Sequence, residues 1–88
     1  MGDLIKNIDK LHTTPMGAER IKRNLNLQTD GAVAWCKKVV EQADIIIGRG
    51  KSFYVYKSGV VITINVRSFT IITAHEINAK SNGEYPLN

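Results

Sequence analysis

The sequence is poor in cysteine and has no long apolar run. Cys36 is its only cysteine, so no internal disulfide can form, whereas small secreted domains normally need several. No apolar stretch approaches the ~20 residues that span a membrane. The charged residues 1–10 do not have the apolar centre of a signal peptide. We therefore expect a soluble, cytoplasmic protein that does not contact a membrane.

The residues needed for several kinds of catalytic centre are also missing. His12, His75 and Cys36 are too few and too widely spaced for a zinc site. The Gly-Arg-Gly segment at 48–50 does not precede a helix and does not match a nucleotide-binding loop. The predicted sheet contains no carboxylate and therefore offers no pair for glycosidase chemistry. The sequence therefore predicts neither a metal nor a cofactor.

Acidic residues are absent from Ile45 to His75, although the chain contains eight of them. The basic residues of this stretch are Arg49, Lys51, Lys57 and Arg67. The remaining eight Lys and Arg residues equal the eight acids in number, so the whole net charge of +4 falls on this stretch. A surface with only positive charge attracts phosphate groups. The alternative is that these residues simply keep the edges of a sheet soluble.

The first half of the chain has the apolar spacing of helices. Apolar residues recur at i, i+4 and i+7 within Asp3–Leu11, which predicts a helix there. Thr14 stands before a proline and is a typical helix start, so a second helix is predicted over Pro15–Leu25. Thr29 or Asp30 is expected to cap a third helix. The apolar stripe of that helix is formed by Ala32, Val33, Cys36, Val39 and Val40.

After residue 44 the period changes to that of strands. β-Branched and aromatic residues recur in four short segments separated by turn residues. The predicted strands are Ile45–Ile47, Ser52–Lys57, Val60–Val66 and Phe69–His75, with turns at 48–50, 58–59 and 67–68. Turns this short require antiparallel neighbours, and helices must cover one face of the sheet. We therefore predict one α+β domain over residues 1–78, with two to three N-terminal helices on a four-stranded antiparallel meander, and a polar tail at 79–88.

The predicted sheet carries polar residues that suit RNA chemistry without a metal. Cleavage of RNA by its own 2′-hydroxyl needs a general base, a general acid and cationic stabilisation of the phosphate. His75 is a candidate for proton transfer near neutral pH. The candidates for holding phosphate are Arg49, Lys51 and Arg67. Tyr54 and Tyr56 are candidates for stacking on bases.

The side of the sheet on which His75 lies depends on the register of the last hairpin. With a turn at 67–68, Asn65 pairs with Thr70. The same register places Thr73 and His75 on one face with the isoleucines of the preceding strand, which are expected in the core. His75 could then act in catalysis only if it lay beyond the part of the sheet that the helices cover.

The other candidates have plain structural alternatives. Tyr54 and Tyr56 can simply pack across neighbouring strands. His12 is expected to cap or end a helix. Cys36 is expected to be a small core residue, and Trp35 a partly buried packing anchor.

Two pairs of segments resemble a small bacterial family of unknown function. They are NIDKLHTT (7–14) with RIKRNL (20–25), and VITIN (61–65) with SFTIITAH (68–75). The resemblance extends over residues 3–78 and implies no established activity.

The order of the elements has a second, more distant resemblance. Helices followed by a four-stranded meander that ends in Thr-Ile-Ile-Thr-Ala-His are similar to the barnase–EndoU–colicin–RelE class of metal-independent ribonucleases. These enzymes commonly act as toxins and carry their active residues on the open sheet face. The roles implied by the resemblance are acid or base for His75, orientation for Thr73 and Ser68, and phosphate binding for Arg49, Lys51 and Arg67. No second His or Glu lies on the sheet, so the resemblance leaves the general base unassigned.

We therefore expect a metal-independent, endoribonuclease-like and toxin-like domain that acts on RNA without a cofactor. A non-catalytic nucleic-acid-binding module is the first alternative, and it would use the same basic and aromatic residues without His75. The second alternative is a small protein-interaction or regulatory protein of a mobile element. Its working surface would be the sheet edge or the helix face with Trp35, and its partner another protein or a second copy of the chain.

Overall fold

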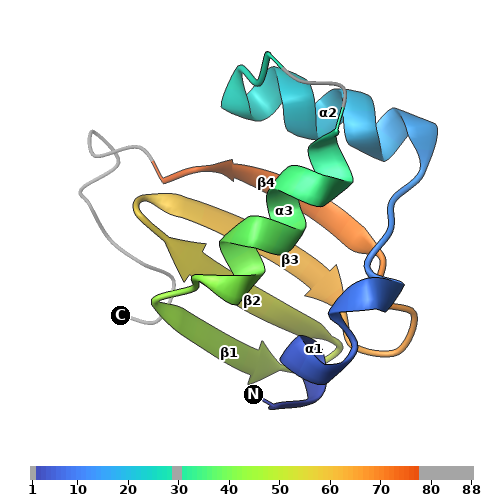
Figure 1. Ribbon diagram of the computed structural model, residues 1–88, viewed down its shortest axis with the longest axis vertical. Helices are drawn as coiled ribbons and strands as arrows, with labels where there is room; N and C mark the ends of the chain where they lie inside the picture. Colours follow the sequence, from blue (N-terminus) through green and yellow to red (C-terminus); the bar gives the residue numbers. More distant parts are fainter. Residues whose placement is uncertain (1, 29–30, 78–88) are drawn as a thin grey trace.

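The fold consists of short helices followed by a four-stranded sheet (Figure 1). The computed structural model describes residues 2–28 and 31–77. The elements are α1 (Gly2–Lys6), the 3-10 helix η1 (Ile8–Lys10), α2 (Pro15–Leu25), α3 (Ala32–Glu41), β1 (Ile45–Arg49), β2 (Ser52–Lys57), β3 (Val60–Asn65) and β4 (Ile71–Glu76). The strands lie in the order β1-β2-β3-β4 and all neighbours are antiparallel, which confirms the predicted α+β meander. The predicted tail at 79–88 and the predicted caps Thr29 and Asp30 lie outside the described residues.

The helices cover one face of the sheet, as predicted. In Figure 1, α3 crosses this face and α2 lies beside β4. The buried sheet residues that face the helices are Val55, Ile62, Ile64, Ile71 and Ala74, and they form one core with Leu4, Leu11, Ile21, Leu25, Cys36 and Val40. Burying an aliphatic side chain of this size stabilises the fold by about 1.5–3 kcal/mol relative to leaving it exposed. Trp35 is half-buried against this core, which confirms its predicted position.

The first helix was predicted as one continuous element over Asp3–Leu11, and this prediction is wrong. The chain leaves the α-helical path at Asn7 and continues as a 3-10 turn, with i→i+3 hydrogen bonds from Lys10 N to Asn7 O and from Leu11 N to Ile8 O. The tighter turn redirects the chain so that both Leu4 and Leu11 remain buried. The second helix begins as predicted, since the Thr14 hydroxyl accepts a hydrogen bond from Gly17 N at 3.0 Å.

The two-residue turn between β2 and β3 was predicted correctly. Ser58 and Gly59 both have positive φ, 48° and 81°, which is the geometry of a type I′ turn. The predicted turn at 48–50 lies further along the chain, because Arg49 still pairs with Ser52 and belongs to β1.

Replacing Ser58 with asparagine is expected to stabilise the domain by up to about 1 kcal/mol, because asparagine adopts positive φ more readily than serine. Replacing Gly59 with alanine is expected to destabilise it by about 1–2 kcal/mol, because a Cβ is unfavourable at φ 81°. Urea unfolding followed by circular dichroism measures both. Nothing within 4 Å would meet the new Cβ at residue 59, so any loss there comes from the backbone.

The register of the last hairpin corrects one prediction. Asn65 pairs with Thr70 as expected, through the hydrogen bond from Asn65 N to Thr70 O at 2.9 Å. The register then shifts between Thr63 and Ile64, so that Thr63 faces Thr73 and Ile72 is an extra residue. Because side chains alternate with a period of two, one extra residue moves the following side chains to the other face. Thr73 and His75 therefore lie on the face opposite the helices, and their predicted place beside the core isoleucines is wrong.

The two edges of the sheet differ. The outer edge of β4 is covered by residues 12–13 and by α2. His12 O accepts from Ile71 N at 2.7 Å, the Thr13 hydroxyl donates to Ile71 O at 2.9 Å, and Asn24 on α2 donates to Ala74 O at 3.3 Å. Strand β1 forms the opposite edge, and no described residue pairs with its outer side. The chain thus uses the segment between η1 and α2 to close one edge of the sheet.

Candidate functional site

One end of the sheet collects most of its basic residues. Arg49 pairs with Ser52, which pairs with Asn65, so these three residues lie in one row across β1, β2 and β3. The carbonyl of Lys51 accepts from Val66 N at 3.0 Å, and Arg67 follows directly in the β3–β4 turn. We call this region the basic end; it is formed by residues 49–52, residues 65–70 and residues 10–13.

His75 lies at the other end of the sheet. It pairs with Val61, close to the turn at Ser58 and Gly59, whereas Ser68 follows the far end of β3. The four residue-to-residue steps from Val61 to Asn65 span roughly 13 Å at about 3.3 Å per step. Thr73 lies between the two ends, opposite Thr63. The structure therefore does not bring together the three predicted catalytic residues, His75, Thr73 and Ser68.

The two tyrosines differ in exposure. Tyr54 is half-buried and lies opposite Thr63 on the sheet face away from the helices. Tyr56 lies on the same face but is only 3% exposed, so its ring is not available to stack on a base. Among the predicted aromatic contacts, Tyr54 alone has an accessible ring.

His12 enters the basic end from the segment before α2. Its backbone N donates to Phe69 O at 3.3 Å, and it forms a parallel bridge with Thr70. These contacts place the imidazole beside two hydroxyl groups. The distance from His12 Nε2 to Thr70 Oγ1 is 3.1 Å, and that from Thr70 Oγ1 to Ser68 Oγ is 2.7 Å. His12, Thr70 and Ser68, which we call the hydroxyl–imidazole chain, are thus linked at the surface.

The tautomer of His12 follows from one fixed hydrogen-bond partner. His12 Nδ1 lies 2.8 Å from the carbonyl oxygen of Lys10. A carbonyl only accepts, so Nδ1 carries the proton, and in the neutral ring Nε2 is then an acceptor. The Thr70 hydroxyl can donate to Nε2 and accept from Ser68, or it can turn and donate to Ser68 Oγ. The second arrangement leaves the Nε2 lone pair free for another donor.

The turn that carries Ser68 is held in place by the side chain of Asn65. Asn65 Oδ1 accepts from Arg67 N at 2.8 Å and from Ser68 N at 3.0 Å. Phe69 adopts φ 58°, an unusual conformation for a bulky residue, while its side chain packs on the core. Lys10 Nζ lies 5.9 Å from the centre of the Phe69 ring, which brings a fourth cation to the basic end.

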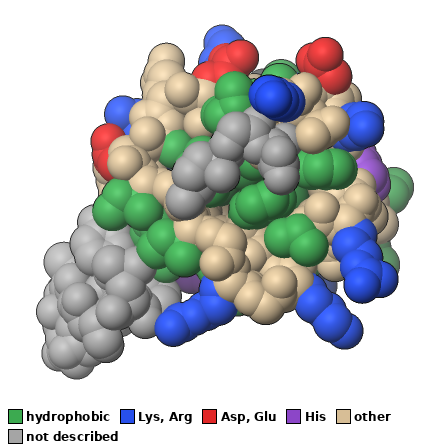
Figure 2. Space-filling view, turned by 90° about the horizontal axis from the view of Figure 1, so that it is seen from below, with side chains coloured by type: hydrophobic (Ala, Val, Ile, Leu, Met, Phe, Trp, Pro, Cys, Tyr) green, Lys and Arg blue, Asp and Glu red, His purple; other side chains and the backbone are tan. Residues whose placement is uncertain are grey.

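The surface view is consistent with this concentration of charge. In Figure 2, several Lys and Arg side chains and a histidine lie together on the right-hand side, the side on which Figure 1 shows the β1–β2 and β3–β4 turns. The described carboxylate nearest to this group in sequence is Asp9, on the exposed side of η1. Positive charge therefore dominates the surroundings of the hydroxyl–imidazole chain.

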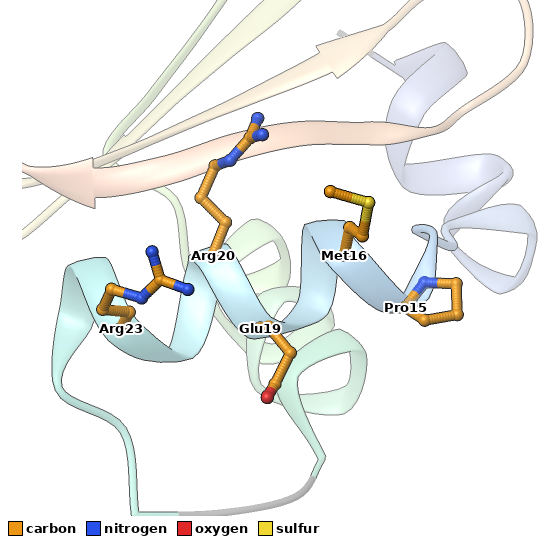
Figure 3. Close-up of a pocket in the computed structure, with 5 residues that line it drawn as sticks. All are labelled: Pro15, Met16, Glu19, Arg20 and Arg23. Atoms are coloured by element: carbon orange, nitrogen blue, oxygen red, sulfur yellow. The ribbon is translucent and has the colours of Figure 1, made fainter.

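A shallow hollow elsewhere on the surface lies along α2 (Figure 3). It is lined by Pro15, Met16, Glu19, Arg20 and Arg23, all from this one helix. Figure 3 shows Met16 and Arg20 pointing to one side of the helix and Glu19 to the other. Glu19 also forms an ion pair with Lys22 at 3.6 Å. Because only one element lines this hollow, it does not bring groups from distant parts of the chain together.

The described residues limit the other kinds of site. Within residues 2–28 and 31–77, no three His, Cys, Asp or Glu side chains are placed to hold a metal ion. No helix in this part of the chain is long and apolar enough to cross a membrane. Cys36 is fully buried, and burial raises the pKa of its thiol to about 12, so the thiol is not an available nucleophile.

Sequence reasoning missed the contact between His12 and Thr70. His12 was expected to cap or end a helix, and Thr70 lies 58 residues away from it in the sequence. The local signal that could have found it is the run of polar residues at 12–14, which does not continue the helical stripe and is matched by Ser68 and Thr70 near the last strand.

Comparison with known proteins identifies a family and no activity. A family model described as "protein of unknown function (DUF3781)" matches residues 5–75, which include the basic end and the hydroxyl–imidazole chain. No curated protein and no solved structure matches the chain significantly, so the similarity to the ribonuclease class stays a prediction. The match covers most of the chain, and the protein belongs to the DUF3781 family.

Proposed function

We propose that this protein binds single-stranded RNA through the basic end of its sheet. The observation that carries the proposal is the convergence of Lys10, Arg49, Lys51 and Arg67 at one end, in a half of the chain that has no Asp or Glu from Ile45 to His75. Lys and Arg side chains bind phosphate by charge, and arginine adds a bidentate geometry.

Neighbouring groups favour RNA among the polyanions. Tyr54 lies on the same sheet face as Arg49 and is partly exposed, as stacking platforms for unpaired bases are. The hydroxyls of Ser68 and Thr70 can donate to or accept from a ribose 2′-hydroxyl, the group that distinguishes RNA from DNA. Cations, an aromatic ring and hydroxyls are thus available on adjacent strands and turns.

The test compares two double variants that remove the same charge. Replacing Arg49 and Arg67 with alanine is expected to weaken binding of a labelled single-stranded RNA oligonucleotide at least tenfold and to lower the slope of log K against log salt by about 1.4, since each lost phosphate contact contributes about 0.7. Replacing Arg20 and Arg23 on α2 is the matched control, because both residues are exposed and lie outside the basic end. Fluorescence anisotropy at several salt concentrations measures both.

Equal losses in the two variants, or no binding by the unchanged protein at low salt, would contradict the proposal.

The exposed edge of β1 supports the second candidate function, interaction with another protein or a second copy. Ile45 on this strand is 46% exposed, and no described residue pairs with its outer side. A dimer detected by light scattering, together with no affinity for RNA, would favour that function.

A further inference from the structure

We infer that His12, and not His75, is the general base of a metal-independent RNA cleavage at the basic end, with Thr70 as its positioning residue. This inference rests on the proposed function, because it needs RNA bound beside His12. It names a catalytic residue in a segment that lies outside the sheet.

The tautomer of His12 is the first argument. The Lys10 carbonyl holds the proton on Nδ1 and thereby leaves Nε2 as the basic nitrogen. A base that is held in one tautomer and one orientation does not have to reorganise before it accepts a proton. His75 has no hydrogen bond of this kind among the described contacts, and its strand end is roughly 13 Å from the turn that carries Ser68.

The rigidity of the surroundings is the second argument. Backbone hydrogen bonds from His12 N to Phe69 O and from Ile71 N to His12 O tie His12 to the start of β4. The imidazole therefore lies at the edge of the sheet, although His12 is far from β4 in the sequence. Asn65 fixes the turn that carries Ser68. A site built from two distant segments that are locked together by the backbone meets the geometric demand that catalysis places on its groups.

The hydroxyl pair is the third argument. Thr70 Oγ1 lies 3.1 Å from Nε2 and 2.7 Å from Ser68 Oγ, so its proton can point to either neighbour. While the site is empty, Thr70 donates to Nε2. When an RNA 2′-hydroxyl approaches, Thr70 donates to Ser68 and frees the Nε2 lone pair. In both arrangements the Thr70 hydroxyl donates a hydrogen bond, either to Nε2 or to Ser68 Oγ. This lowers the free-energy cost of replacing Thr70 by the 2′-hydroxyl as the donor to Nε2.

The reaction that follows is balanced without a co-reactant. His12 Nε2 takes the proton of the 2′-hydroxyl, and the 2′-oxygen forms a bond to the adjacent phosphorus as the bond from phosphorus to the 5′-oxygen breaks. The 5′-oxygen takes a proton from water, and His12 returns its proton to the hydroxide that remains. The products are a 2′,3′-cyclic phosphate and a 5′-hydroxyl end. Lys10 and Arg67 offset the charge that builds up on the phosphate oxygens.

The experiment uses the full chain and a labelled single-stranded RNA oligonucleotide in EDTA, with RNA binding measured in parallel. The unchanged protein is expected to release a fragment with a 2′,3′-cyclic phosphate. His12→Ala and His12→Gln are expected to slow this release by at least a hundredfold while RNA binding is retained, in line with the usual contribution of a general base. His75→Ala is the matched control and is expected to cleave normally.

Two further variants and one substrate test the role of Thr70 and the nucleophile. Thr70→Val removes the hydroxyl and keeps the shape, so it is expected to slow cleavage, and Thr70→Ser is expected to restore it. An oligonucleotide with 2′-deoxyribose at the cleaved position is expected to stay intact there.

Three results would overturn the inference. They are RNA that is bound but not cleaved by the unchanged protein, cleavage that survives in both His12 variants, and cleavage that is lost in His75→Ala. The first of these leaves the proposed RNA binding in place, whereas an unchanged affinity in the Arg49 and Arg67 double variant removes the binding proposal itself. The two proposals can therefore fail separately.

Discussion

Replacing Ile62 with alanine is expected to destabilise the domain by about 2–5 kcal/mol. Ile62 is fully buried and faces the helices between Val55 on β2 and Ala74 on β4. The loss combines the transfer free energy of the removed carbons with the cavity that neighbouring elements cannot close. A domain of this size has a total stability of about 5 kcal/mol, so much of the variant is expected to be unfolded under conditions in which the unchanged protein is native.

Urea unfolding measures this loss through the fluorescence of Trp35, which is half-buried against the core. The matched control is Ile72→Ala. Ile72 has the same side chain, but it is the extra residue in the β4 bulge and is 43% exposed. The control is expected to lose less than about 1 kcal/mol, because much of the Ile72 side chain stays in contact with water in the folded protein. Similar losses in the two variants would show that the core is not centred on the β2–β3–β4 face.

Local rules were sufficient for the start of α2 and for the turn between β2 and β3. Thr14 followed by proline predicts the start of α2, and its hydroxyl caps that helix in the structure. Ser58 and Gly59 predict a two-residue turn, and both adopt the positive φ that such a turn requires. Each of these features depends on residues within three positions of one another, so the sequence alone contains the information.

The face on which His75 lies could not be predicted in the same way. Alternation assigns faces only while the pairing continues without interruption, and the bulge adds one unpaired residue. The adjacent Ile71 and Ile72 break the alternation, but two neighbouring apolar residues do not show which of them is extra. The contact between β3 and β4, and the core position of Ile71, decide this in the folded protein.

The candidate site also combines residues that local rules place correctly with one that they do not. Arg49, Lys51 and Arg67 flank turns that the sequence predicts, and antiparallel strands bring such turns to one end. His12 arrives there through a parallel bridge between an irregular segment and Thr70. No periodicity marks that contact, because it joins an irregular segment to a residue 58 positions further along the chain. The three cations at the turns were therefore predictable, and the position of His12 was not.

The remaining large effect concerns Cys36, the only cysteine of the chain. It is fully buried on α3, and burial raises the pKa of its thiol to about 12 from an ordinary value of 9.0. Near pH 8 the thiolate fraction is then lower by about a thousandfold than in the unfolded chain, and the thiolate is the reactive form. We expect a disulfide reagent to label the native protein at least a thousandfold more slowly than the protein in urea. Rapid labelling of the native protein would place Cys36 outside the core.

The same shift makes stability depend on pH in the alkaline range. The folded thiol keeps its proton up to about pH 12, whereas the unfolded thiol begins to lose it near pH 9. The unfolded state therefore binds fewer protons between these values, and Cys36 is expected to lower the free energy of unfolding by about 1.4 kcal/mol for each unit of rising pH. Below pH 9 its contribution is constant.

Other groups also titrate above pH 9, so the measurement is the difference in stability between the unchanged protein and Cys36→Ala, followed by urea unfolding from pH 7 to 11. The variant is less stable at pH 7, where it lacks the packing of the sulfur, and its deficit is expected to shrink above pH 9 because it has no thiol to ionise. A deficit that stays constant over the whole range would mean that ionisation of Cys36 is not coupled to unfolding.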